Sequence, residues 1–419
     1  MLLLTSITVF AGVGPRIEKK WLMALPFWCC SHQLNRVIVN ASALQIVRNS
    51  IGTADKIVKF FDNSPQREHL LKEEIKSSSV DKDSRPTKTK LQWFCKTRWV
   101  ERHDAYDQLV ELLPCVVSTL ETVKDTFSRR EAVADATCLI KAVDFEFLIA
   151  LIVMACALSY IQALSVQLQG PTLDVVKALT HVNTTITTVK DVRKNVEIHH
   201  KKWYDQAVTL GDKIDVSPSK PRTTKRQKHR ENVEAESAEE YFKRALTIPF
   251  LDHLIQEFET RFGALQLKAC KAIDLVPKVL GTTATSAVDL KYFEDDLPSP
   301  HQLEAEIHMW KLFWESQESQ PESLGEALRA CDESLYPNIK RILQIAACFP
   351  VTSCECERSI SRLGEIKTLK RSSMSSERLN GLVLISTHRA NLPSHDEIIK
   401  RFSLLHPRRL ELSTLFNDM

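Results

Sequence analysis

Apolar residues recur at every third or fourth position between 99 and 213, and again between 235 and 348. That spacing places them on one face of an α-helix. Only 10 of the 419 residues are glycine, and no regular alternation of short apolar runs and glycine-rich turns is present. The pattern therefore predicts a mainly helical protein.

The apolar pattern also predicts where the elements begin and end. Breaks are expected near Pro114, at 128–130 and at 170–171, and one long helix is expected over 173–210. A short buried strand is predicted at 26–31, ahead of a helix that begins near His32. Further helices are predicted at 235–262, 265–276, 302–318, 323–329 and 337–348.

The last hundred residues predict two more helices. Thr352 and Glu355 have the spacing of a capping box, so a helix is expected to begin there. After a serine-rich break, a final helix is predicted at 377–388, and its apolar residues cover more than one face. Such a helix needs partners on more than one side, and a second copy of the chain can be one of them. The apolar residues of these two helices are Ile360, Leu363, Ile366, Leu379, Leu382, Val383 and Ile385.

Two polar segments, 76–90 and 215–235, are predicted linkers. The second carries a basic run that could serve nuclear targeting or contact nucleic acid, or could be a solvated linker. The run consists of Lys220, Arg222, Lys225, Arg226, Lys228 and Arg230. Acidic residues follow it directly, and the net charge of the chain is only +3. Nucleic-acid binding is therefore not indicated by global charge, and nuclear targeting is favoured over direct DNA contact.

Two apolar segments have the look of membrane or export signals. Residues 1–14 lack a basic start and a cleavage site of small residues, so secretion is not expected. Residues 147–164 are about as long as a membrane span, but they contain Ser159, Tyr160 and Gln162. We expect this segment to be a buried helix of a helical bundle and expect no membrane partner.

The eleven cysteines form no regular ladder, which is typical of a reduced intracellular protein. Cys138 and Cys156 are expected to be small buried hydrophobic residues. Cys29, Cys30 and His32, or Cys348, Cys354 and Cys356, could suggest zinc, but neither group has a second pair at finger spacing. No metal and no cofactor are expected. Trp310 and Trp314, at i and i+4, are expected in a core or an interface.

Three stretches together resemble the hAT family of DNA transposases. They also resemble vertebrate proteins derived from that family, both those of the zinc-finger MYM type and those named as repressors of the inhibitor of the protein kinase. The first is Cys29-Cys-Ser-His32-Gln-Leu-Asn35, and the second is Lys96-Thr-Arg98-Trp99-Val-Glu-Arg102. The third runs from Phe349 to Ser361 and continues from Met374 to Ser386. It is similar to the C-terminal dimerisation region of the family.

The resemblance implies an RNase H-like core in which three acidic residues hold two metal ions, with a long helical insertion before the third acid. Glu357 matches the last of these acids, and the first 25 residues hold no counterpart of the other two. One carboxylate cannot assemble a metal pair, so the resemblance implies a vestigial acid and a catalytically inactive chain. The alternative role of Glu357 is a carboxylate stabilised by a helix N-terminus. Cys29, His32, Asn35, Arg98 and Trp99 are then structural motif residues.

The expected fold class is mainly α, with the remnant of an RNase H-like α/β core whose sheet is mostly missing. Residues 1–50 are expected to be that remnant, 51–335 the helical insertion, and 336–419 the end of the core with the dimerisation region. The leading hypothesis is a non-catalytic nuclear protein that forms a homodimer or pairs with another hAT-derived protein. The alternative is a nucleic-acid-binding protein, or a transposase fragment complemented by a partner or by upstream sequence.

Overall fold

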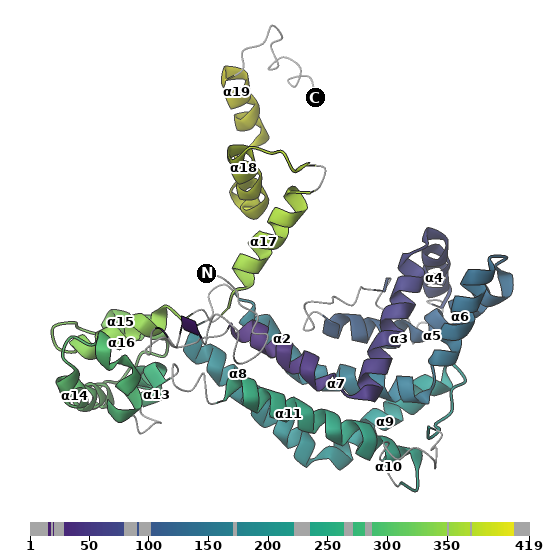
Figure 1. The fold of residues 1–419 in the computed structure, drawn as a ribbon, viewed down its shortest axis with the longest axis horizontal. Coiled ribbons are helices and arrows are strands. Elements are labelled where there is room, and N and C mark those ends of the chain that lie inside the picture. The colour runs from purple at the N-terminus through teal and green to yellow at the C-terminus, as the bar shows by residue number, and fades with distance from the viewer. Residues whose placement is uncertain are drawn as a thin grey trace. The chain divides into compact units, whose positions relative to one another are not determined.

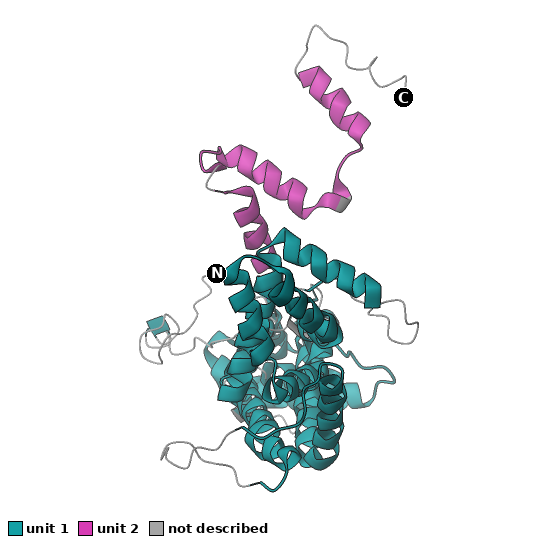
Figure 2. Ribbon diagram, turned by 90° about the vertical axis from the view of Figure 1, so that its right-hand side faces the viewer, with its two compact units in different colours: residues 1–352 teal, residues 353–419 magenta. Residues whose placement is uncertain are grey.

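The computed structural model describes residues 16–17, 20, 29–78, 90–91, 102–170, 174–221, 235–263, 271–280, 287–349, 352–368 and 371–405. Every regular element in this part of the chain is a helix, which confirms the mainly α fold class. The chain divides into a first unit, Met1–Thr352, and a second unit, Ser353–Met419 (Figure 2).

The larger core of the first unit includes the buried Leu246 of the π-helix η3 (Lys243–Thr247). Most of its other residues lie on the α-helices labelled α2 to α11 in Figure 1. They are α2 (Cys30–Ala41), α3 (Gln45–Asp62), α4 (Pro65–Ser77), α5 (Arg102–Thr126), α6 (Arg130–Ala142), α7 (Phe145–Leu168), α8 (Val175–Lys194), α9 (Val196–Asp212), α10 (Ala238–Phe242) and α11 (Ile248–Phe262). Helix α11 packs against α2 and α8, whereas α5 packs against α4, α6 and α7.

The strand predicted at 26–31 is wrong for its described residues. Cys29 is the N-cap of α2, and its Sγ accepts a hydrogen bond from the His32 amide at 3.4 Å. The helix therefore starts at Cys30, with Leu34, Val37 and Ile38 buried as the helical spacing predicts. Residues 26–28 lie outside the described residues.

Two predicted boundaries also differ from the structure. Pro114 lies inside α5 rather than at a break. A proline in a helix interior costs about 3 kcal/mol, but here Leu112, Leu113 and Val116 around it are all fully buried, and this packing outweighs the local cost. The long helix predicted over 173–210 is in fact two, α8 and α9, which meet at Asn195. The Asn195 side chain donates to Asp191 Oδ1 at 3.0 Å.

The helical stretch from 238 to 262 contains one wider turn. Residues Lys243–Thr247 form a π-helix, η3, and Pro249 follows at the start of α11. Proline lacks an amide hydrogen, and its ring crowds the carbonyl four residues earlier. A wider turn before Pro249 accommodates both effects without ending the helix.

Helix α7 is the one described helix long and apolar enough to cross a membrane. Of its most apolar window, 72% is buried inside the protein. Consecutive residues from Phe147 to Ala155 are all buried, so neighbouring helices surround α7. The buried helix that the sequence predicts for 147–164 is therefore confirmed.

A second, smaller core in the first unit lies among the segments from 271 to 347. They are η4 (Lys271–Leu275), α13 (Pro277–Leu280), η5 (Ala287–Asp296), η6 (Pro300–Gln302), α14 (Leu303–Glu315), α15 (Leu324–Ala330) and α16 (Pro337–Ala347). Asp174 connects this cluster to α8. One carboxylate oxygen accepts from the Val176 amide at 2.8 Å, and the other accepts from the Leu324 amide of α15 at 3.0 Å.

The second unit contains α17 (Cys354–Ile366), α18 (Ser376–Thr387), η8 (Arg389–Asn391) and α19 (His395–Leu405). Helices α17 and α18 pack against each other. Thus the predicted helix at 377–388 is confirmed, whereas α19 was not predicted.

The cysteine predictions hold only in part. Cys29 and Cys30 are buried and Cys156 is half-buried, but Cys138 is exposed on α6, contrary to the prediction. Burial raises the pKa of the Cys156 thiol to about 11. Of the candidate zinc ligands in the C-terminal group, Cys348 and Cys356 are exposed.

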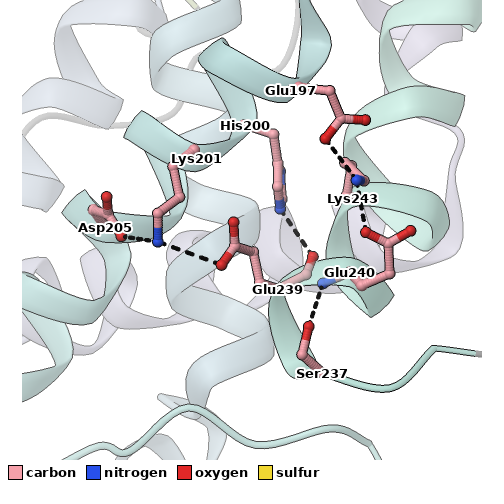
Figure 3. A network of polar contacts seen from close by, with 8 residues as sticks. All are labelled: Glu197, His200, Lys201, Asp205, Ser237, Glu239, Glu240 and Lys243. Carbon is pink, nitrogen blue, oxygen red and sulfur yellow. Dashed lines mark hydrogen bonds and ion pairs between the residues drawn. The ribbon is translucent and has the colours of Figure 1, made fainter.

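A polar network joins α9 to α10 and η3 around His200 (Figure 3). The His200 ring is 1% exposed, with Nε2 3.0 Å from the Glu239 carbonyl oxygen and Nδ1 2.9 Å from Thr247 Oγ1. Since a carbonyl only accepts, Nε2 carries the hydrogen, and the Thr247 hydroxyl can donate to Nδ1. Nearby, Lys243 forms ion pairs with Glu197 and Glu240 at 2.7 and 2.6 Å.

This network makes the stability of the first unit depend on pH. Burial lowers the pKa of His200 below its ordinary value of 6.5, so the folded chain keeps a neutral ring at pH values where the unfolded chain takes up a proton. The stabilisation is complete above pH 6.5 and is lost as pH falls towards the folded pKa, with a slope of at most about 1.4 kcal/mol per pH unit.

We expect His200→Gln to remove the part of the pH dependence of stability that comes from His200, because glutamine can donate to Glu239 and accept from Thr247 without titrating. Urea unfolding between pH 7.5 and 5.5 measures the slope of the free energy of unfolding against pH. The exposed His308 offers a matched control, and His308→Gln is expected to keep the wild-type slope. Equal slopes in wild type and His200→Gln would contradict the role given to His200.

Candidate interaction surface

Helix α17 begins one residue later than the predicted capping box requires. Its N-cap is Ser353 rather than Thr352, and the Ser353 side chain makes no bond to a backbone amide. Instead, Ser353 Oγ donates to Glu357 Oε1 at 2.9 Å, while the Ser353 carbonyl accepts from the Glu357 amide at 3.0 Å. The N-cap is therefore Ser353 rather than the predicted Thr352, and the hydroxyl of this buried serine is bonded to Glu357 in the first turn.

Glu357 is a half-buried side chain in that first turn. A carboxylate there lies near the unpaired amides of the helix N-terminus, which favour negative charge by about 0.3–1 kcal/mol. Among the residues that the structure describes, no group of three or more His, Cys, Asp or Glu side chains could hold a metal ion. The observed contact of Glu357 is with the Ser353 hydroxyl, which joins this carboxylate to the start of α17.

Helices α17 and α18 leave much of their apolar surface uncovered. Ile360, Leu384 and Ile385 are 62%, 59% and 52% exposed. None of the twelve residues of α18 is buried. The other predicted interface residues are half-buried: Leu363, Ile366, Leu379, Leu382 and Val383. Arg362 holds the two helices together by donating to the Ser386 carbonyl.

Helix α19 adds a further apolar stripe to the second unit. Ile398, Phe402 and Leu405, at i, i+4 and i+7, are 47%, 43% and 66% exposed. A true capping box begins this helix: the Glu397 amide donates to Ser394 Oγ at 3.3 Å, and the Ser394 amide donates to Glu397 Oε2 at 2.9 Å. The spacing of Ser394 and Glu397 was the signal in the sequence that could have predicted it.

Of the remaining predicted site residues, the structure describes only some. His32 and Asn35 are half-buried on α2, while Arg98 and Trp99 lie outside the described residues. Lys220 donates to the carbonyls of Ala235 and Glu236 at 2.8 and 3.0 Å. The rest of the predicted basic patch also lies outside the described part of the chain.

Trp310 and Trp314 lie in the smaller core, as predicted. They are 0% and 9% exposed, and their ring centroids are 5.4 Å apart in an edge-to-face contact. Trp310 Nε1 donates to the Leu275 carbonyl at 2.9 Å. Its indole is therefore occupied by packing within the chain and is not available to stack on a nucleic-acid base.

A buried carboxylate, which the sequence gave no reason to expect, joins α14 to α16. Glu306 is 5% exposed, and its Oε2 accepts from the amides of Asn338 and Ile339 at 2.9 and 3.2 Å. Its Oε1 accepts from Asn338 Nδ2 at 2.5 Å. Glu306 thereby caps the first turn of α16 from another helix. Burial raises the pKa of its carboxyl, although these hydrogen bonds act in the opposite direction.

Comparison with known proteins identifies the segment that contains these helices. Residues 303–390, from the start of α14 to η8, match the hAT family C-terminal dimerisation region. The chain is also 29% identical over 415 residues to the human "52 kDa repressor of the inhibitor of the protein kinase", and 29% identical over 420 residues to the mouse protein of that name. These alignments cover 96% and 97% of the chain but 54% and 55% of the relatives, so the chain spans about half their length.

The cap formed by Glu306 predicts a large effect of its removal. Glu306→Ala leaves the two buried amides of Asn338 and Ile339 without their acceptor and removes one of the two acceptors of Asn338 Nδ2, which also donates to the Ser299 carbonyl. This is expected to lower the free energy of unfolding by at least about 2 kcal/mol. Glu306→Gln keeps one acceptor oxygen and is expected to lose less. Urea unfolding followed by tryptophan fluorescence measures both variants, because Trp310 lies on the same helix.

Glu315→Ala is the matched control on α14, since Glu315 is exposed and its ion pair with Lys311 spans 3.9 Å on the helix surface. Surface ion pairs of this kind contribute little to stability, so the free energy of unfolding is expected to change by no more than about 0.5 kcal/mol. If Glu306→Ala lowers the free energy of unfolding no more than Glu315→Ala does, the cap is not needed for stability.

Proposed function

Starting from the relationship of this chain to hAT transposase-derived proteins, we propose that it functions by protein dimerisation through α17 and α18, in a regulatory and non-catalytic role. The partner is a second copy or another hAT-derived protein. The observation that supports this proposal is the apolar surface formed by Ile360, Leu384 and Ile385. Each of these side chains is more than half exposed in one copy of the chain. The match to a dimerisation region covers all three residues.

The energetics of association favour a larger contact than these three residues alone. Full burial of an exposed Leu or Ile contributes about 1.5–3 kcal/mol, so a side chain already half-buried contributes about 1 kcal/mol or more. Six such side chains, three from each copy, contribute roughly 6 kcal/mol, at the lower end of the roughly 4–15 kcal/mol that association costs. The half-buried Leu363, Ile366, Leu379, Leu382 and Val383 therefore belong to the proposed interface.

The non-catalytic role is supported by the relatives, both of which are named repressors. A repressor that acts through protein contacts needs partner recognition rather than bond cleavage, and we propose a nuclear location on the same basis. Within this proposal Glu357 is a vestigial acid that stabilises the start of α17. Residues 1–50 and 336–419 are the proposed parts of an RNase H-like core, with 51–335 as its helical insertion.

Charge placed in the centre of the proposed interface is expected to separate the dimer. Ile385→Glu puts a carboxylate on the exposed apolar face of α18, where burial against a partner would remove it from water. Sedimentation-velocity ultracentrifugation of the full chain at micromolar concentration is expected to show a dimer for wild type and a monomer for this variant. Its circular dichroism is expected to be unchanged.

Ser373→Glu supplies the control, because Ser373 is an exposed polar residue in the serine-rich break between α17 and α18 and the added charge is the same. This variant is expected to remain dimeric. A wild-type chain that sediments as a monomer would refute the dimerisation proposal. Nicking of DNA with Mg²⁺ that disappears in Glu357→Gln would refute the non-catalytic one.

A further inference from the structure

Helix α14 has three distinct faces. One face, with Leu303, Ile307, Trp310 and Trp314, is buried in the smaller core. A second face is polar and exposed, and it carries Glu304, His308, Lys311 and Glu315. The third face carries Met309, Leu312 and Phe313, which are 50%, 53% and 43% exposed. The spacing i, i+3, i+4 makes these three side chains neighbours on the helix surface.

We propose that this third face of α14 is a second contact between two copies of the chain; the inference rests on the proposed dimerisation and deepens it. Single exposed apolar residues are normal on protein surfaces, but three adjacent large ones on one helix form a patch typical of an interaction site. The exposed charged residues of α14 are confined to its second face, although the apolar positions of the third face are exposed as well.

The occupant is a second copy for two reasons. First, the match to the dimerisation region starts at Leu303, the first residue of α14, so the patch lies within the same segment as the proposed interface on α17 and α18. Second, the face is free of charge along its length, with Ala305 and Ser316 at its two ends. In a two-fold contact the same surface meets itself, and an uncharged surface brings no like charges together.

The size of the patch defines how it contributes. A stable interface buries about 800 Å² on each partner, more than three side chains supply. The α14 face therefore adds to the contact made by α17 and α18 and does not replace it. Loss of the α14 contact weakens the dimer, whereas loss of the α18 contact abolishes it.

The experiment measures the dissociation constant of the full-length dimer by sedimentation equilibrium. Leu312→Glu is expected to raise the constant tenfold or more, and the milder Met309→Gln, which introduces no charge, is expected to raise it several-fold. His308→Glu adds the same charge to the polar face of α14 and is expected to leave the constant within twofold of wild type. Circular dichroism and tryptophan emission report whether each variant is folded.

The outcomes separate this inference from the dimerisation proposal. If Leu312→Glu and Met309→Gln leave the constant unchanged while Ile385→Glu separates the dimer, the α14 contact is refuted and the proposed function stands. If these variants lower the stability of the fold but leave the dissociation constant of the dimer unchanged, another part of the same chain covers the third face of α14. That result also refutes the α14 contact between two copies. A monomeric wild type refutes the proposed function itself.

Discussion

A helix with apolar residues on more than one face must find neighbours on each of those faces, and this constraint governs the whole chain. Helix α7 meets it inside the first unit, where consecutive side chains from Phe147 to Ala155 are buried on all sides. Helix α18 has a similar run, Leu382 to Ile385, yet none of its residues is buried. The same physical requirement that makes α7 the centre of a core leaves α18 in need of a partner.

The first unit acts as a scaffold whose polar groups are largely satisfied across elements. Asp174 provides acceptors for the first turns of α8 and α15, and Glu306 provides them for α16. His200 connects α9 to the carbonyl of Glu239 and to Thr247. Because an unpaired buried amide costs about 1–3 kcal/mol, these side chains determine which helices can lie together.

The proposed interaction surface differs from this scaffold in kind. Helices α17, α18 and α19 form few buried contacts of their own, and their apolar residues lie at the surface. Helix α14 combines the two behaviours, since one face completes the smaller core while Met309, Leu312 and Phe313 remain outside it. The match to the dimerisation region starts at this helix, so the region spans both the folded cluster around α14 and the helices α17 and α18 with their exposed apolar residues.

The sequence by itself determined the helical class, most helix positions and the apolar faces of α2, α14, α16 and α18, because a period of 3.6 residues is a local property that needs no partner. It also carried the resemblance that places the dimerisation region near the C-terminus. Only the tertiary structure decided that Pro114 stays inside a helix, that Asn195 separates two, and that Pro249 follows a π-turn. These outcomes depend on packing that competes with local preference. The same holds for Glu306, whose amide partners lie more than thirty residues away on another helix, so that no local pattern marks it as a cap.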